Sequence, residues 1–126
     1  MAPPRILVVD DEADIAGILG AILRRAGHQV RMAGDGVEAL EMIAREPPDV
    51  VLLDVRMPRL DGLETLRRLR QAAATARLPV IVLTANAEPA DRAGALAAGA
   101  DECVAKPFEA ADVLARVQAL LARSGA

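Results

Sequence analysis

Five polar side chains lie at the ends of short runs of mostly apolar residues: Asp10, Asp11, Asp54, Thr84 and Lys106. They comprise three carboxylates, one hydroxyl and the single Lys of a chain that has fifteen basic residues. A Lys ammonium is a compact point charge, which Arg does not replace where one tight contact is needed. Together these groups suit a site that holds a divalent cation and the oxygens of a phosphoryl group.

Three carboxylates that come close together repel one another, and at least one of their pKa values rises unless a cation compensates. Mg²⁺ suits such a site because it takes oxygen ligands, typically one or two carboxylates with waters and a phosphate oxygen. The sequence places no His or Cys beside these acids, which argues against zinc. A carboxylate next to the ion can attack phosphorus as a nucleophile.

The apolar runs alternate with helical patterns. Ile6–Val9, Val50–Leu53 and Val80–Leu83 are unbroken and β-branched, which is typical of strands buried on both faces. Gln29–Ala33 and Glu102–Ala105 are more polar and are predicted to be edge strands. Five strands alternating with five helices predict an α/β fold with a doubly wound parallel sheet. Right-handed crossovers favour the strand order 2-1-3-4-5, in which the polar residues meet at the carboxyl edge.

Several local patterns indicate where helices begin and end. Asp35 with Glu38, and Asp61 with Glu64, resemble capping boxes at helix starts, and Gly27 is expected to end the first helix. Pro47-Pro48 should end the second helix, and a final amphipathic helix follows residue 110.

The fourth helix is expected over Pro89 to about Ala98 and has an unusual composition. Leu96 is its only large apolar residue, and Gly94 lies inside it. Interior Gly costs up to about 1 kcal/mol relative to Ala. Two interpretations stay open: an intrinsically poor helix, or an element of low local stability that shifts during function.

Composition excludes several classes of function. Hydrophobic residues make up 53% of the chain, which is enough to form a hydrophobic core. The length predicts one domain over residues 1–126, folded over about 4–122 and with a short tail at 123–126. No apolar run is long enough to span a membrane, and no signal-peptide pattern is present. A net charge of −3 and a single aromatic residue, Phe108, argue against direct nucleic-acid binding. The single Cys suits a reducing, cytoplasmic location.

The sequence resembles the receiver domains of bacterial two-component response regulators. The matching motifs are Val8-Val9-Asp10-Asp11-Glu12, Leu53-Asp54-Val55-Arg56-Met57-Pro58 with Asp61-Gly62, Leu83-Thr84-Ala85 and Ala105-Lys106-Pro107-Phe108. They span essentially the whole chain, and their spacing is highly specific. The resemblance implies a flavodoxin-like (βα)5 fold.

The resemblance also implies roles for individual residues. Asp54 would accept a phosphoryl group from a sensor histidine kinase or a phosphotransfer protein. Mg²⁺ would be held by Asp11, Asp54 and the backbone carbonyl of Arg56, with Asp10 acting through water. Thr84 and Lys106 would contact the phosphoryl group, and the peptide bond before Pro107 would be cis.

The chain departs from the family at its switch aromatic, a Tyr or Phe three residues before the Lys. Cys103 stands there and is expected to be a small buried side chain rather than a redox sensor. Signal transmission would then depend on Thr84, the loop after it and the fourth helix. The rate of phosphate loss, which varies in the family with Arg56 and Asn86, is not predicted.

Some charged residues admit two interpretations. Asp101, Glu102 and Arg116 resemble charges that pair across a symmetric, phosphorylation-dependent homodimer in one receiver subgroup; simple surface charges are an equal alternative. Arg67, Arg68 and Arg70 are expected to form a solvated face. His28, in a polar loop, is expected to be solvated.

Two other functions compete with a phosphorylation switch. A phosphatase that works through an aspartyl phosphate would need an acid two residues after the nucleophile, where this chain has Arg56, and a substrate cap that its length does not allow. An interaction module that never takes phosphate is weakened by the presence of all five site residues. We therefore expect a signalling domain rather than an enzyme, acting by binding partners through helix 4, strand 5 and helix 5 or by passing the phosphoryl group onward.

Overall fold

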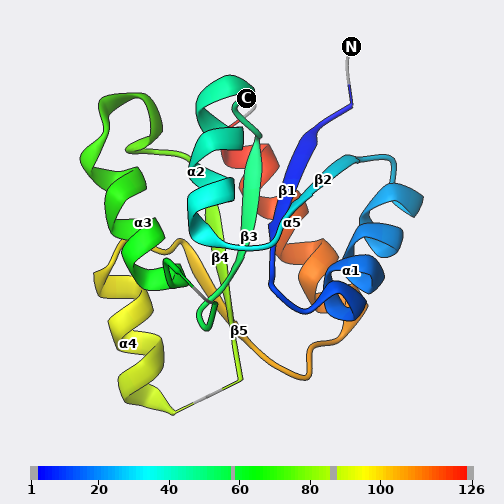
Figure 1. The fold of residues 1–126 in the computed structure, drawn as a ribbon. Coiled ribbons are helices and arrows are strands. Elements are labelled where there is room, and N and C mark those ends of the chain that lie inside the picture. Colours follow the sequence, from blue (N-terminus) through cyan, green and yellow to red (C-terminus); the bar gives the residue numbers. More distant parts are fainter. Residues whose placement is uncertain (1–2, 58, 86–87, 125–126) are drawn as a thin grey trace.

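A computed structural model describes residues 3–57, 59–85 and 88–124, so Asn86 and the end of the tail lie outside the described residues. Its strands form one parallel sheet in the order β2-β1-β3-β4-β5 (Figure 1). The strands are β1 Arg5–Val9, β2 Gln29–Ala33, β3 Val50–Asp54, β4 Val80–Thr84 and β5 Glu102–Ala105. The predicted order is confirmed. Asp54 and Thr84 are themselves the last strand residues, one position beyond the apolar runs.

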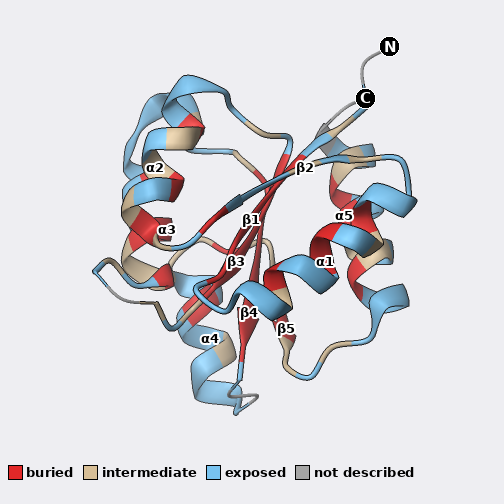
Figure 2. Cartoon of the chain, turned by 45° about the vertical axis from the view of Figure 1, so that its right-hand side comes forward, coloured by how far each residue is buried: buried red, intermediate tan, exposed pale blue. Residues whose placement is uncertain are grey.

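The helices cover both faces of the sheet. They are α1 Ala13–Arg25, α2 Gly36–Arg45, α3 Gly62–Gln71, α4 Pro89–Ala97 and α5 Ala110–Ser124, with a short 3₁₀ turn, η1, at Ala73–Thr75. Figure 2 shows α1 and α5 on one side of the sheet, and α2, α3 and α4 on the other. Each helix turns its buried residues toward the strands, as the amphipathic patterns predict.

Two apolar layers result, one on each face of the sheet. Alternate residues of β3 point to opposite sides: Val50 and Leu52 join the layer under α1 and α5, while Val51 and Leu53 join the layer under α2 and α3. All four side chains are completely buried. Unbroken apolar runs thus mark strands covered on both faces.

The predicted helix boundaries are confirmed. The carboxylates of Asp35 and Asp61 accept hydrogen bonds from the amides of Glu38 and Glu64 at 2.8 and 2.9 Å. Gly27 ends α1 with a φ of 96°, a conformation that residues with a side chain rarely adopt.

The prediction of a solvated His28 is wrong. Both imidazole nitrogens are buried, and within the described residues neither has a hydrogen-bond partner. His28 lies between the turn at Gly27 and β2 and is partly exposed as a residue, but its two ring nitrogens do not reach solvent.

Arg70 also departs from the expected solvated face. Arg67 and Arg68 are exposed on α3, but the Arg70 side chain is only 18% exposed and pairs with Asp101 at 3.2 Å. Its guanidinium also donates to the carbonyls of Gly99, Thr75 and Leu78. Arg70 therefore ties the end of α3 to the start of β4 and to the turn before β5.

The fourth helix is held by little apolar surface. Ala95 is its only buried residue among those described, and Leu96 is 50% exposed. The small buried surface of α4 agrees with low local stability, which both interpretations of this helix share.

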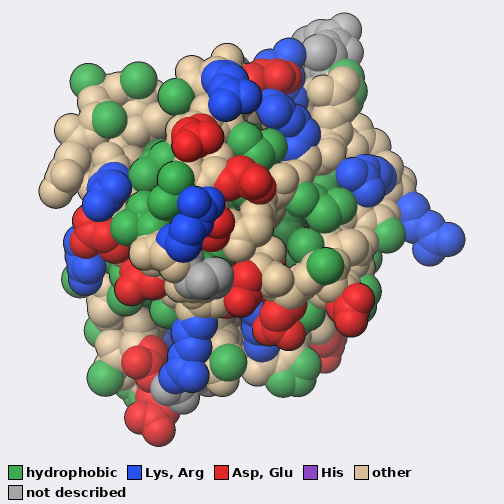
Figure 3. All heavy atoms as spheres, viewed as in Figure 1, with side chains coloured by type: hydrophobic (Ala, Val, Ile, Leu, Met, Phe, Trp, Pro, Cys, Tyr) green, Lys and Arg blue, Asp and Glu red, His purple; other side chains and the backbone are tan. Residues whose placement is uncertain are grey.

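The surface mixes both signs of charge. On the face shown in Figure 3, Lys and Arg side chains lie among Asp and Glu side chains and do not gather into one basic region. Within the described ranges, no helix is both long enough and apolar enough to cross a bilayer.

Candidate functional site

The register of the sheet brings the predicted acids together. Val9 lies opposite Leu53, so Asp10 and Asp54 are the next residues on two neighbouring strands. Asp10 is 3% exposed and Asp54 is 5% exposed. Two carboxylates thus lie side by side at the carboxyl edge, with little water to separate their charges.

Lys106 is brought to the same edge by β5. Thr84 lies opposite Ala105, and the amide of Lys106 donates to the Thr84 carbonyl at 2.7 Å. The Lys106 ammonium then donates to Asp10 at 3.1 Å and to Asp54 at 3.2 Å. One cation therefore bridges the two buried acids.

The pKa values follow from this unequal match of charges. Burial raises the pKa of Asp54, the nearby charge of Asp10 raises it further, and Lys106 only partly opposes both effects. Burial alone would lower the pKa of Lys106, but its hydrogen bond to Asp10 and the charge of Asp54 raise it on balance. The Lys106 ammonium is stabilised by two carboxylates, whereas the two carboxylates have only this one ammonium between them. The site therefore holds an excess of negative charge.

A second group of acids lies at the start of α1. Carboxylate oxygens of Asp10, Asp11 and Glu12 all lie within 4.8 Å of one another. Asp11 and Glu12 are exposed, and the Glu12 amide donates to Asp10 at 2.9 Å. An all-oxygen donor set beside a carboxylate-rich edge fits a hard cation such as Mg²⁺. Glu12 is a further candidate ligand; it lies in the first motif of the sequence, but no role in the site was predicted for it.

The loop after Asp54 closes tightly on itself. The Gly62 amide donates to the Val55 carbonyl at 2.9 Å, and a Cβ on Gly62 would lie 2.1 Å from the Asp54 carbonyl oxygen. Only Gly fits at that distance. In the Asp-Gly pair of the motif, Asp61 therefore caps the start of α3 with its side chain. Gly62, which has no side chain, allows the helix to begin directly against the site.

Comparisons with known proteins agree with this geometry. Residues 6–118 match the family model described as "Response regulator receiver domain". The chain belongs to the response regulator receiver domains. The Mycobacterium leprae response regulator MprA is 49% identical over 120 residues, which are 95% of this chain and 52% of that protein. The chain thus spans about half the length of this relative.

Solved receiver structures have the same fold. The receiver domain of Francisella response regulator 1452 is 34% identical with a TM-score of 0.91, covering 96% of this chain and 98% of that one. Vibrio cholerae chemotaxis protein CheY4 is 32% identical with a TM-score of 0.89, covering 95% of this chain and all of that one.

The remaining predicted residues of this receiver domain lie on β4, on β5 and just after β5. Thr84 is 6% exposed and borders a hollow of about 240 Å³ that Arg56, on the loop after Asp54, and Asp91, on α4, also line. The Lys106–Pro107 peptide bond is cis. Cys103 is buried, as expected, and burial raises its thiol pKa.

The charges proposed for a dimer make pairs within the receiver domain itself. Arg116 pairs with Glu102 and, at 3.0 Å, with Asp112. One oxygen of Asp101 accepts from Arg70 and from the amide of Val80, and the other lies 3.4 Å from Arg123. Asp101 is therefore already part of the fold, while Glu102 and Arg116 remain about one-third exposed.

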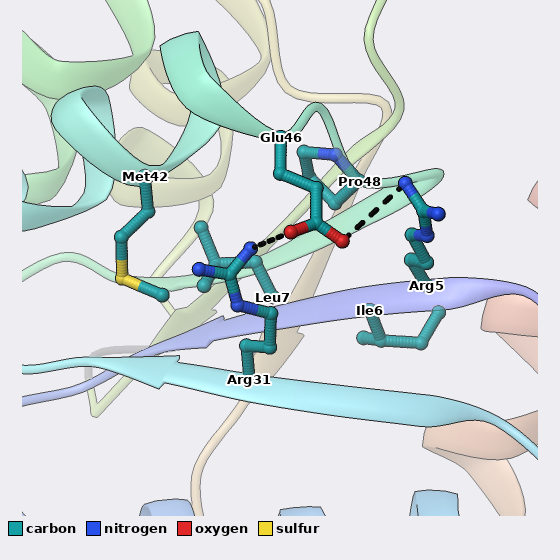
Figure 4. Close-up of a pocket in the computed structure, with 7 residues that line it drawn as sticks. All are labelled: Arg5, Ile6, Leu7, Arg31, Met42, Glu46 and Pro48. Carbon is teal, nitrogen blue, oxygen red and sulfur yellow. Dashed lines mark hydrogen bonds and ion pairs between the residues drawn. The ribbon is translucent and has the colours of Figure 1, made fainter.

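A small hollow at the opposite edge of the sheet is separate from this site. It holds about 10 Å³, roughly the room for one water, and lies over the beginnings of β1 and β2. Glu46 lies between Arg5 and Arg31 there and pairs with both, at 3.4 and 2.9 Å (Figure 4). One acid there is shared by two cations, the reverse of the charge balance around Asp54, and the length of β1 separates the hollow from Asp10.

Proposed function

We propose that Asp54 accepts a phosphoryl group in a Mg²⁺-dependent reaction and that the chain works as a signalling switch. The observation that carries this proposal is the bridge from Lys106 to Asp10 and Asp54, beside further carboxylates at the start of α1. Three acids and one cation leave uncompensated negative charge that a divalent ion would neutralise. Residues 1–126 would form one receiver domain.

In the proposed reaction, a carboxylate oxygen of Asp54 attacks the phosphorus of a phosphohistidine donor. The bond between phosphorus and the donor's imidazole nitrogen breaks, and the imidazole leaves. Asp11, Asp54 and the Arg56 carbonyl would hold Mg²⁺, with Asp10 acting through water. When bound, the ion would neutralise charge on the phosphoryl oxygens. Lys106 would move from pairing with Asp54 to pairing with the new phosphoryl group.

Readout would begin at Thr84. Its hydroxyl would turn toward the phosphoryl oxygens, and the hollow beside it, bordered by α4, would change shape. Because α4 is held mainly through Ala95, a modest difference in contacts can shift it. With Cys103 at the aromatic position, we propose that the surface of α4, β5 and α5 changes without an aromatic gate.

The chain acts as a signalling domain rather than a turnover enzyme in this proposal. Arg56, two residues after Asp54, cannot serve as a general acid for ester hydrolysis. The phosphodonor would be a sensor histidine kinase or phosphotransfer protein, and the compartment would be the cytoplasm. Neither nucleic acid nor a membrane surface would be a direct partner, because the net charge is −3 and the face in Figure 3 mixes charges of both signs.

The decisive experiment is incubation with acetyl phosphate and Mg²⁺, followed by intact-mass spectrometry. We expect the gain of one phosphoryl group, its loss with EDTA, and no gain in Asp54→Asn. Asp61→Asn is a matched control, because Asp61 lies nearby but serves as a helix cap. Equal labelling of Asp54→Asn, or continuous release of phosphate from an ester by wild type, would contradict the proposal.

We further propose a phosphorylation-dependent homodimer through α4, β5 and α5. Glu102 and Arg116 are positioned on that face, and exchanging their pairing to a second copy would retain the same charge matches. Asp101 would contribute through the oxygen that faces Arg123. Light scattering with beryllium fluoride should show a dimer that Arg116→Glu abolishes. A wild-type protein that stays monomeric at high concentration would rule it out.

A further inference from the structure

We propose that the ion pair between Arg59 and Asp35 holds the β3–α3 loop in the shape that binds Mg²⁺, which makes Arg59 a positioning residue of the Asp54 site. The inference rests on the Mg²⁺ role in the proposed function. It concerns a contact between two loops on the carboxyl edge of the sheet, neither of which carries the phosphoacceptor itself.

The pair is well formed on both sides. The Arg59 guanidinium donates through Nε and Nη2 to one oxygen of Asp35, at 3.0 and 2.6 Å. The other Asp35 oxygen accepts from the Glu38 amide at 2.8 Å. Only 15% of the Asp35 side chain is exposed. The contact with the Glu38 amide fixes the Asp35 carboxylate to the start of α2. The ion pair with Arg59 therefore fixes the loop relative to α2.

The loop depends on this contact because its two ends and its tip are held differently. Its ends meet through the hydrogen bond from Gly62 to Val55. Its tip lies against α2, where a Cβ on Gly36 would be 2.6 Å from the Leu60 carbonyl oxygen. Arg59 is next to that approach, and Arg56 lies between the closed end and the tip. The tip is thus held by the approach of Leu60 and by the Arg59 ion pair, and we expect loss of the pair to let the carbonyl of Arg56 move.

Asp35 is also fixed with respect to the acids. The amide of Asp10 donates to the carbonyl of Ala33 at 3.1 Å, two residues before Asp35. The Gly34 amide, between them, donates to Glu38 at 2.9 Å. Contacts therefore run from Asp10 through the β2–α2 turn and across the ion pair to the loop that follows Asp54.

The backbone at Arg59 supports a role for its side chain. Its φ is 65°, in the region that favours Gly. Gly would adopt this conformation at a lower cost in free energy than Arg. The advantage of Arg at this position is therefore its guanidinium. An Arg side chain without a contact would not offset the cost of this backbone conformation.

Arg59→Gly gives a sharp test because charge and positioning predict opposite results. Removal of a cation near a metal site should strengthen Mg²⁺ binding by charge alone. Loss of positioning should weaken it, and we expect a Kd for Mg²⁺ about two- to five-fold higher by isothermal titration calorimetry. Amide hydrogen exchange in the β3–α3 loop of the Mg²⁺-free protein should be faster, with the remainder of the chain unchanged.

Three variants complete the experiment. Asp35→Asn keeps the acceptor for the Glu38 amide but loses the charge, so it should weaken Mg²⁺ binding in the same way. Arg59→Lys should restore part of the affinity. Arg68→Ala, which removes an equally exposed Arg that pairs only with Glu64 among the described residues, should leave the Kd unchanged.

The outcomes separate this inference from the function on which it rests. A wild-type protein that binds Mg²⁺ and an Arg59→Gly variant that binds it as well or better would overturn the positioning role alone. An equal loss in Arg68→Ala, or faster exchange throughout Arg59→Gly, would also overturn it. A wild-type protein that binds no Mg²⁺ would overturn both.

Discussion

The ammonium of Lys106 lies 3.2 Å from the carboxylate of Asp54, although 52 positions separate them in sequence. Lys106 lies just as close to Asp10, so it is the shared counterion of two buried acids. A phosphoryl group on Asp54 would take over this cation and leave Asp10 to the metal. In the proposed function, the same contact pairs Lys106 with two buried acids before phosphorylation and supplies the cation that the phosphoryl group would meet.

Replacement of Asp54 by Asn should stabilise the protein at pH 7. The folded-state pKa of Asp54 is raised above 3.8, first by burial and then by Asp10, so folding disfavours its charged form. The folded protein then binds more protons than the unfolded chain, and the cost of Asp54 disappears as the pH falls through the folded pKa. We expect Asp54→Asn to unfold with a free energy higher by on the order of 1 kcal/mol at pH 7.

Urea unfolding from pH 7 down to pH 4 measures this effect. The advantage of Asp54→Asn should shrink steadily as the pH falls. A difference in the free energy of unfolding that stays constant with pH would show that ionisation of Asp54 does not destabilise the folded protein. Asp49→Asn, which changes an exposed carboxylate at the opposite edge of the sheet, controls for general charge effects.

Two glycines should respond to Ala in opposite ways. Gly62→Ala would place a Cβ 2.1 Å from backbone, so the loop after Asp54 must shift, at a cost of about 1–3 kcal/mol or more. Gly17, exposed inside α1, has nothing within 4 Å of its Cβ position, and Gly17→Ala should stabilise by about 0.5–1 kcal/mol. Thermal unfolding distinguishes them, and a neutral Gly62→Ala would contradict the close approach.

Gly94→Ala tests whether the weakness of α4 is functional. Its Cβ position is also open, so Ala should stabilise α4 by about 0.5–1 kcal/mol. If switching needs a mobile α4, the variant should keep normal labelling on Asp54 but show a smaller beryllium fluoride-induced change in hydrogen exchange over α4. Gly17→Ala is the matched control, and an unaltered response in Gly94→Ala would favour a merely poor helix.

Arg70→Ala should be the most destabilising Arg substitution on α3. It would remove one donor from three carbonyls and from one oxygen of Asp101, at a cost of about 2–4 kcal/mol. The Thr75 carbonyl and the Asp101 oxygen would keep their backbone amide donors. Arg67→Ala, on the same helix but exposed, should change the free energy of unfolding by less than about 0.5 kcal/mol. Similar effects of the two changes, measured by urea unfolding, would argue against the network.

The fold and the main site could be predicted from sequence because both follow from local patterns. Buried runs at Val50–Leu53 and Val80–Leu83 identify the central strands, and parallel strands bring their carboxyl ends to one edge. The position of Asp54 then needs no knowledge of side-chain packing. The predicted ends of these two strands, at Asp54 and Thr84, are confirmed.

What the sequence did not reveal are contacts between distant polar side chains. Arg70 and Asp101 are 31 positions apart, and Arg59 and Asp35 are 24 apart. No periodicity marks such pairs, because each depends on where two helices or loops meet in space. His28 was misplaced for the same reason: its sequence neighbours are polar, but the fold covers its two ring nitrogens.

Phe108 is the single aromatic residue besides His28, since the chain has no Trp or Tyr. Its ring packs beneath α1 and α5 two positions after Lys106, whereas His28 precedes β2 at the other end of the sheet. After exchange of the N–H protons in D2O, the aromatic region of a proton NMR spectrum should therefore contain only two spin systems, one from each edge. The proposed phosphorylation of Asp54 could be followed through the Phe108 resonances without isotope labelling, with the imidazole signals as an internal reference.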